Sequence, residues 1–203
     1  MTDSSPASAA PALAILLAGG TGTRAALGTP KQLALLGGKP VLRWSLDALA
    51  GHPAIAGGVL VAHDDVVMAV GGLPDGWLSA PPGRERQESV ANALAVLGDA
   101  NDDARVLVHD AARPGLSAAV IDRMLAALGT HDAAIPVLPV PDTLVERRTE
   151  LAGDVVDRNG LARVQTPQAF RLAMLRRAHD GAQEGLATDD AQMVRRLGID
   201  VAA

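Results

Sequence analysis

The chain of 203 residues lacks cysteine, and its only Phe, Trp or Tyr side chains are Trp44, Trp77 and Phe170. Without cysteine, disulfide scaffolds, thiolate zinc sites and cysteine nucleophiles are excluded. The scarcity of rings argues against proteins that bind single strands by stacking bases on aromatic side chains. Ala, Val and Leu must therefore fill the core, which suits helices packed on a sheet of small branched residues.

Long apolar runs are missing too, since none approaches the roughly 18 residues that span a bilayer. Asp3 stands where a signal peptide would carry basic residues, so we expect residues 1–11 to be a disordered tail and the protein to be cytoplasmic. A net charge of −5 disfavours nonspecific binding to nucleic acid. Because 48% of the residues are hydrophobic, residues 12–203 are expected to form one domain with a full core. The charge and the short apolar runs together predict no nucleic-acid and no membrane partner.

Short apolar runs alternate with segments of helical spacing along most of the chain. This alternation predicts an α/β fold, a mostly parallel sheet with helices on both faces. Residues 141–165 hold no helical stripe and are expected to form a projecting arm. We expect strands at 13–18, 59–61, 77–80, 106–108 and 133–140, the last of them an edge strand weakened by Pro136 and Pro139. Helices are expected after Pro40, over 90–97, after the cap Ser117, over 171–182 and over 189–197, where Thr188 is the expected cap.

The strongest local motif, LAGGTGTR at 17–24, follows the first expected strand and precedes Pro30-Lys31. Glycines after a strand let backbone N–H groups approach phosphates, and Arg24 and Lys31 add fixed positive charge for a polyphosphate. The dinucleotide-binding fingerprint fits poorly, because Gly28 and Pro30 interrupt the helix that should follow it. A Walker P-loop is excluded, since Gly28 is not followed by Lys and Ser or Thr.

Several further motifs occur in a fixed order, and with this loop they resemble the 2-C-methyl-D-erythritol 4-phosphate cytidylyltransferase family. The resemblance implies a Rossmann-like nucleotidyltransferase fold. It also implies transfer of CMP from CTP to a polyol phosphate, with Mg²⁺ bridging the triphosphate. The motifs are GRERQESV at 83–90, HDAARP at 109–114, PDT at 141–143, Asp157-Arg158, QTPQAF at 165–170 and TDD at 188–190.

The resemblance also assigns roles to individual residues. Arg24 and Lys31 match the family's transition-state residues. The nucleotide would contact Ala18, Gly19, Gly20, Gly83 and Ser89. The polyol phosphate would contact Asp110, Arg113, Thr143 and Arg158, and Asp110 is the one side chain expected near the metal. Arg158 would reach the site of a second subunit, so the arm implies a homodimer.

Simpler interpretations stand beside these roles. Ser89 could cap a helix, Asp110 and Arg113 could form a structural ion pair, and TDD at 188–190 could be helix capping. His109 is expected to be a core histidine rather than a base, and His63 to be structural.

Other functions remain open on the sequence. LAGG at 17–20 and Val145, where the family usually has Lys, favour ribitol-5-phosphate cytidylyltransferase, whereas HDAARP at 109–114 and Asp157-Arg158 favour methylerythritol phosphate. Pro82 and Arg84 also depart from the family pattern. The chain stops before the family's C-terminal lysine segment, which favours a fragment of a longer or bifunctional protein, or a nucleotide-binding module without turnover. Molybdopterin-type nucleotidyltransferases would share only the first loop.

Overall fold

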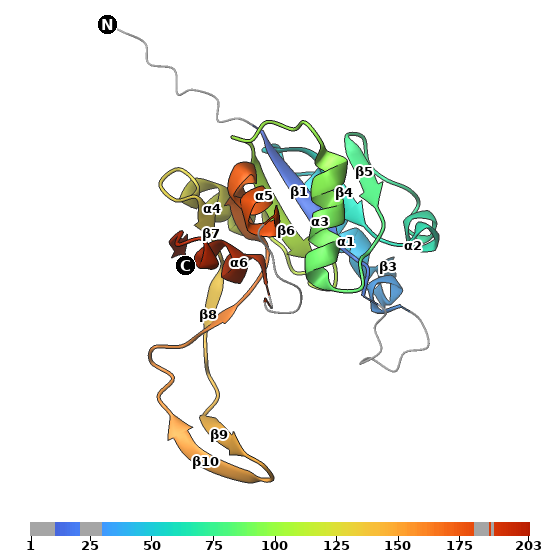
Figure 1. Cartoon of the computed structure of the whole chain (residues 1–203). Coiled ribbons are helices and arrows are strands. Elements are labelled where there is room, and N and C mark those ends of the chain that lie inside the picture. The colour runs from blue at the N-terminus through green and yellow to red at the C-terminus, as the bar shows by residue number, and fades with distance from the viewer. Residues whose placement is uncertain (1–10, 21–29, 181–186, 188) are drawn as a thin grey trace, which may run out of the picture.

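The computed structural model describes residues 11–20, 30–180, 187 and 189–203. In this part of the chain the central element is a seven-stranded sheet with the order β13-β7-β12-β6-β1-β4-β5 (Figure 1). Its strands are β1 (Ala12–Leu17), β4 (Ile55–Val61), β5 (Trp77–Ala80), β6 (Arg105–Asp110), β7 (Ala133–Ala134), β12 (Gln168–Arg171) and β13 (Val201–Ala202).

Most strand pairs in this sheet are parallel. β1 pairs in parallel with both β4 and β6, β5 pairs with β4, and β13 pairs with β7. The mostly parallel sheet predicted from the sequence is therefore confirmed. The exception is β12, which lies antiparallel between β6 and β7 and is not predicted by the sequence pattern.

Six helices within the described ranges cover both faces of the sheet. Residues that alternate along a strand point to opposite faces, so Leu16 and Leu107 pack with one set of helices and Ile15 and Val108 with the other. Both faces are thus apolar, as expected of a buried parallel sheet. The first face carries α1 (Val41–Ala50), α2 (Asp64–Ala69) and α4 (Ala118–Ala127), and the second carries α3 (Arg86–Leu97), α5 (Leu172–Asp180) and α6 (Asp190–Arg196).

The arm projects away from the sheet as two short antiparallel ladders (Figure 1). At its base β8 (Val137–Pro139) pairs with β11 (Ala162–Val164), and at its tip β9 (Leu144–Arg148) pairs with β10 (Leu151–Val156). The projecting arm is confirmed, but the single edge strand predicted over 133–140 is wrong. That segment divides into β7, inside the sheet, and β8, in the arm, because Pro136 has no N–H for a ladder.

Two helix ends differ from expectation. The N-cap of α6 is Asp189, whose carboxylate accepts the Gln192 N–H at 2.8 Å. The predicted cap, Thr188, lies outside the described residues. Ser117 does stand at the N-cap of α4, but its side chain makes no capping hydrogen bond.

Short elements surround the start of α1. They are the 3₁₀ helix η1 (Lys31–Leu33) and the ladder of β2 (Leu35–Leu36) with β3 (Lys39–Pro40). Within the described ranges, no helix is both long and apolar enough to cross a bilayer.

Candidate functional site

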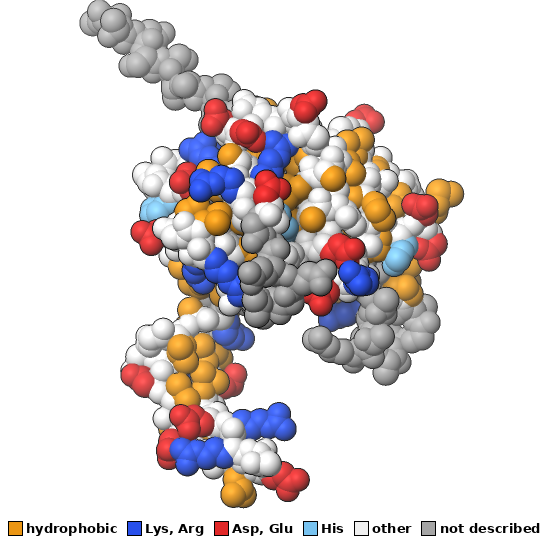
Figure 2. Space-filling view, in the orientation of Figure 1, with side chains coloured by type: hydrophobic (Ala, Val, Ile, Leu, Met, Phe, Trp, Pro, Cys, Tyr) orange, Lys and Arg blue, Asp and Glu red, His pale blue; other side chains and the backbone are white. Residues whose placement is uncertain are grey.

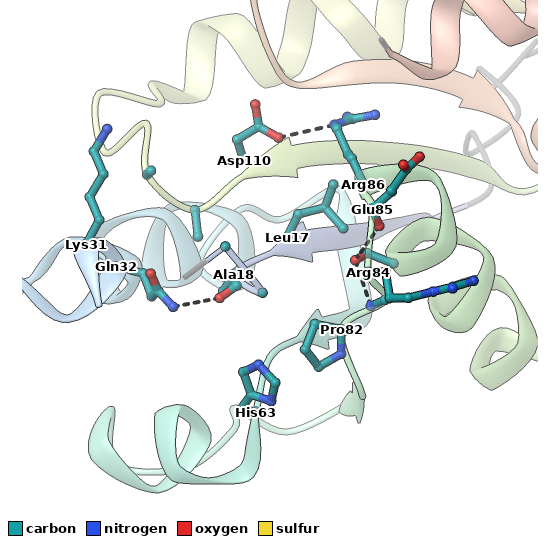
Figure 3. A pocket seen from close by; sticks show the side chains of 16 residues that line it. Leu17, Ala18, Lys31, Gln32, His63, Pro82, Arg84, Glu85, Arg86 and Asp110 are labelled. Carbon is teal, nitrogen blue, oxygen red and sulfur yellow. Dashed lines mark hydrogen bonds and ion pairs between the residues drawn. The ribbon is translucent and has the colours of Figure 1, made fainter. Parts of the chain in front are cut away.

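A pocket of about 650 Å³ opens at the carboxyl ends of β1, β4, β5 and β6 (Figure 3). Because these four strands run parallel, the loops that follow them meet at one edge of the sheet, where open α/β sheets bind ligands. The strand ends, these loops, η1 and the start of α3 line the pocket with Leu17, Ala18, Gly19, Gly20, Lys31, Gln32, His63, Pro82, Gly83, Arg84, Glu85, Arg86, Ser89, Asp110, Ala111 and Ala112.

The loop after β1 is tied to the short helix η1. Buried Gln32 donates from Nε2 to the carbonyl oxygen of Ala18 at 2.9 Å, which fixes η1 against the loop. Lys31, the residue before Gln32, is exposed and lines the pocket. Gln32 thus places the Lys31 ammonium at the rim, on the opposite side of Asp110 from Arg86 in Figure 3.

The loop after β5 is fixed by Ser89, in the first turns of α3. The Ser89 hydroxyl accepts the Gly83 N–H at 3.0 Å and donates to the Glu85 carbonyl at 3.0 Å. A β-carbon on Gly83 would come 2.4 Å from that of Glu88, so only glycine fits there without a shift. Ser89 therefore shapes this loop as well as lining the pocket, while the N-cap position of α3 belongs to Glu85.

Asp110, the last residue of β6, lies between two guanidinium groups. Its Oδ1 is 3.5 Å from Arg86 Nε, and its Oδ2 is 3.4 Å from Arg113 Nε. The carboxylate is only partly buried and lines the pocket. An ion pair between Asp110 and Arg113 therefore exists alongside the exposure of Asp110 to the pocket.

His109, the residue before Asp110, is structural in this fold. Its Nε2 donates to the Arg113 carbonyl at 3.1 Å, and its Nδ1 accepts from the Thr166 hydroxyl at 2.8 Å. Burial lowers the pKa of His109 from 6.5 to about 4, and the bond to the Arg113 carbonyl opposes that effect. A neutral imidazole with both nitrogens occupied cannot act as a base, so it supports the turn that carries Asp110.

Arg86 is the most strongly engaged cation of the pocket wall. Burial alone would lower its pKa, but the charges of Asp190 and Asp110 outweigh burial, and the Arg86 pKa is raised. Its Nη1 donates to Oδ2 of Asp190, whose side chain is fully buried. Burial would raise the pKa of Asp190, but its hydrogen bond to His179 and the charge of Arg86 lower it instead.

The structure brings together many of the site residues expected from the sequence. Arg113 does not line the pocket but reaches Asp110 from beside it. Thr143 and Arg158 lie in the arm, where Arg158 donates to the Pro141 carbonyl, and neither lines the pocket. Arg24 lies outside the described residues. The expected residues that do line the pocket are Ala18, Gly19, Gly20, Lys31, Gly83, Ser89 and Asp110.

The sequence predicts no catalytic or binding role for four residues that the structure ties to this pocket. Arg86 and Asp190 lie inside the motifs at 83–90 and 188–190, but their contact joins positions 104 residues apart. Gln32 follows Lys31 directly, and its amide gave no signal of burial. His63, interpreted as structural, stands at the N-cap of α2 and also lines the pocket.

The fold and the pocket define a doubly wound α/β protein with a pocket at the carboxyl edge of its sheet, where such proteins bind ligands. The model of one family, 2-C-methyl-D-erythritol 4-phosphate cytidylyltransferase (IspD), matches residues 12–203. The chain belongs to this family of nucleotidyltransferases. The family resemblance predicted from the sequence motifs is therefore confirmed.

Individual relatives agree with the family match. The chain is 65% identical to the "Bifunctional enzyme IspD/IspF" of Sphingopyxis alaskensis, over 100% of this chain and 52% of that protein. It is 45% identical to the 2-C-methyl-D-erythritol 4-phosphate cytidylyltransferase of Halorhodospira halophila, over 89% of this chain and 79% of that protein. The chain thus spans about half the length of the bifunctional relatives it matches.

Solved structures share the fold. The cytidylyltransferase of Thermus thermophilus matches with a TM-score of 0.75 and 37% identity, over 94% of this chain and 87% of that one. The enzyme of Francisella tularensis matches with a TM-score of 0.82 and 26% identity, over 95% of this chain and 89% of that one.

Proposed function

We propose that this chain transfers CMP from CTP to 2-C-methyl-D-erythritol 4-phosphate and releases pyrophosphate, a step of non-mevalonate isoprenoid synthesis. The observation that carries the proposal is the pocket itself. In a chain of this family, two glycine-containing loops, Lys31 and Asp110 meet there at the carboxyl edge of a parallel sheet.

The reaction is a substitution at the α-phosphorus of CTP. An oxygen of the 4-phosphate forms a bond to that phosphorus, and the bond to the bridging oxygen of the β-phosphate breaks. The electron pair leaves with pyrophosphate, and no covalent intermediate with the protein forms. The protein therefore contributes by holding the two substrates in line and by stabilising charge that grows on the α-phosphate oxygens.

The two loops supply the nucleotide site in this proposal. Ala18, Gly19 and Gly20 bring backbone groups next to the cytidine and its phosphates, since Gly20 leaves more than 4 Å free where a side chain would stand. Gly83 and Ser89 hold the second loop against the base through their mutual hydrogen bond of 3.0 Å.

Lys31 supplies the positive charge for the chemical step. Its exposed ammonium stands at the rim of the pocket, free to reach the α-phosphate. Arg24 is expected to share this role from the same loop. Two cations on the reacting phosphate stabilise the transition state more than the ground state, because the negative charge there grows during attack.

Mg²⁺ fits the Asp110 carboxylate, which lies at the end of β6 in the pocket. Magnesium commonly binds to one or two carboxylates together with substrate phosphates, and Asp110 offers a partly exposed carboxylate in the pocket. Among the described residues, no group of three or more carboxylate, cysteine or histidine side chains gathers to hold a metal. When bound, the ion would neutralise triphosphate charge and assist the departure of pyrophosphate.

A second copy of the chain would complete the polyol phosphate site. Arg113 lies beside Asp110, whereas Thr143 and Arg158 lie in the arm, away from this chain's own pocket. The arm also exposes apolar side chains, which single solvated hairpins seldom do (Figure 2). We therefore propose a homodimer in which each arm lies over the partner's pocket. The exposed apolar side chains of the arm are Leu138, Val145, Leu151, Val155, Leu161 and Val164.

The remaining expectations, a cytoplasmic location without nucleic-acid or membrane partners, stay predictions. The experiment that tests the activity is turnover with CTP, Mg²⁺ and either of two acceptors, followed by ³¹P NMR. Pyrophosphate and a new diphosphate diester are expected with 2-C-methyl-D-erythritol 4-phosphate. Equal or faster turnover with D-ribitol 5-phosphate would contradict the assignment of 2-C-methyl-D-erythritol 4-phosphate as the acceptor. CTP binding without turnover, here and in a C-terminally longer chain, would indicate a binding module.

A further inference from the structure

A buried ion pair lies directly behind the wall of the pocket. Asp190 is the first residue of α6 and is fully buried, yet it does not cap that helix, because Asp189 does. His179, on α5, donates from Nε2 to Asp190 Oδ1 at 3.0 Å, and Arg86 Nη1 donates to Oδ2. The aspartate that helix capping leaves unexplained is therefore a partner for Arg86.

Arg86 connects this buried carboxylate with the pocket. The residue begins α3, and its Nε lies 3.5 Å from Oδ1 of Asp110 while its Nη1 holds Asp190 (the Asp110 contact is dashed in Figure 3). The planar fork of a guanidinium can serve two carboxylates at once, which a lysine ammonium does less well. Since Arg113 faces Oδ2 of Asp110, each oxygen of that carboxylate has one guanidinium beside it.

Stability alone does not account for this arrangement. A buried ion pair rarely stabilises a fold more than an apolar pair of the same size would, because removing two charges from water is costly. Linking the start of α3 to the start of α6 would need only the Asp190 contact. The second contact of Arg86, to a carboxylate that faces the pocket, points to a task at the site.

We propose that Arg86, held in place by Asp190, is a positioning residue that keeps the Asp110 carboxylate turned toward the polyol phosphate. This inference rests on the proposed function, in which Asp110 contacts that substrate. Arg86 acts through Asp110 and does not itself touch the reacting atoms.

The variant Arg86→Lys separates the two contacts. A lysine keeps the positive charge but can form a close ion pair with only one of the two carboxylates. We expect it to pair with the fully buried Asp190, because an unpaired buried carboxylate is costly. Asp110 then loses one of its two neighbours. We expect KM for the polyol phosphate to rise about tenfold, with kcat and the calorimetric Kd for CTP within about threefold of wild type.

The matched control is Arg176→Lys. Arg176 also serves several partners, Asp102 and the carbonyls of Ala100 and Gly98, but it stands on α5 and does not line the pocket. This variant should lower the urea midpoint and leave both KM values unchanged. If Arg86→Lys behaves in the same way, Arg86 only packs helices and the inference is overturned.

A second background tests the route through Asp110. In Asp110→Asn a neutral amide replaces the carboxylate, so adding Arg86→Lys should change KM for the polyol phosphate by less than about twofold. The same tenfold rise in that background would show that Arg86 acts by another route. The variant Asp190→Asn should also raise KM for the polyol phosphate if it folds. If it does not fold, the KM values of Arg86→Lys alone test the inference.

The same variants also separate this inference from the proposed function. If the wild-type chain does not turn over CTP with the polyol phosphate, the proposed function fails, and urea unfolding then decides the inference. Arg86→Lys should shift the urea midpoint less in Asp110→Asn than in wild type, because the contact is already lost. Equal shifts would show that Arg86 does not engage Asp110, and would overturn the inference without any reference to activity.

Discussion

Gly19 lies so close to Pro82 that a β-carbon on Gly19 would come 2.2 Å from the β-carbon of Pro82. Gly20, the next residue, has no atom within 4 Å of the same position. The loops after β1 and β5 therefore touch at one point, and the first loop has no room for a side chain there. Pro82, which departs from the family pattern, closes that gap.

Gly19→Ala is therefore expected to push the two loops apart. Overpacking of this kind costs about 1–3 kcal/mol of unfolding free energy, and CTP affinity should fall with it. Urea unfolding without nucleotide measures the first effect and calorimetry the second. Gly20→Ala is the control and should leave stability within about 0.5 kcal/mol of wild type. Pro82→Gly added to Gly19→Ala should restore stability, and a failure to do so would contradict the steric account.

The nucleotide site is expected to select cytosine. Calorimetry with Mg²⁺ should show CTP binding at least about tenfold more tightly than ATP or GTP. Backbone groups of the two loops, the first fixed by Gln32 and the second by Ser89, would contact a pyrimidine edge, and a purine would clash with them. Ser89→Ala removes the acceptor of the Gly83 N–H and should reduce that preference. Equal affinity for the three nucleotides would contradict the cytidylyl assignment.

The arm is expected to act on a second subunit. Light scattering should give the mass of a dimer, and Arg158→Ala should raise KM for the polyol phosphate more than KM for CTP. Arg163→Ala is the matched control, since Arg163 also lies in the arm and donates to a proline carbonyl, that of Pro139. A fully active monomer would remove the role of the arm, and an Arg158→Ala effect confined to CTP would reassign the residue.

His109 makes stability depend on pH. Its folded pKa of about 4 lies below the unfolded value of 6.5, so the unfolded state binds more protons between these values and stability falls as pH falls through this window. The loss from pH 7 to below pH 4 is about 3 kcal/mol for such a shift. Urea unfolding of wild type and His109→Gln measures it, with NMR titration of the ring as a direct check. A His109 ring that titrates near pH 6.5 would contradict the structural role.

Periodicity predicted most of the sheet and its helices because those elements are buried on a regular face. The strand over 77–80 and the helix begun after Pro40 are where the spacing put them. β12 was missed because it has four residues and runs directly into α5, leaving no turn signal between them. The apolar pattern over 133–140 predicts one strand, since it does not show that the chain leaves the sheet at Pro136.

The site was predictable where its residues lie at the carboxyl ends of strands or in the loops that follow them. Such loops meet at one edge of a parallel sheet, so Ala18, Gly83 and Asp110 converge as expected. The contact of Arg86 with Asp190 depends on how α5 packs against both α3 and α6, which no local spacing encodes. Thr143 and Arg158 do not converge on this chain's pocket, because the arm carries them away from it.

The central claim, that this pocket performs the chemistry, is tested most directly at Lys31. The chain has only two lysines, so Lys39→Ala is a matched control: Lys39 pairs with Asp47, lies 4.4 Å from the ring centre of Trp44, and does not line the pocket. Lys31→Ala should lower kcat by roughly 10²–10³ and change the Kd for CTP by less than about threefold, since the ammonium acts mainly in the transition state. Lys31→Arg should restore only part of the rate, and Lys39→Ala should change neither quantity. Near-normal kcat with lost CTP binding would make Lys31 a phosphate anchor only, and no change in either quantity would place the active site elsewhere.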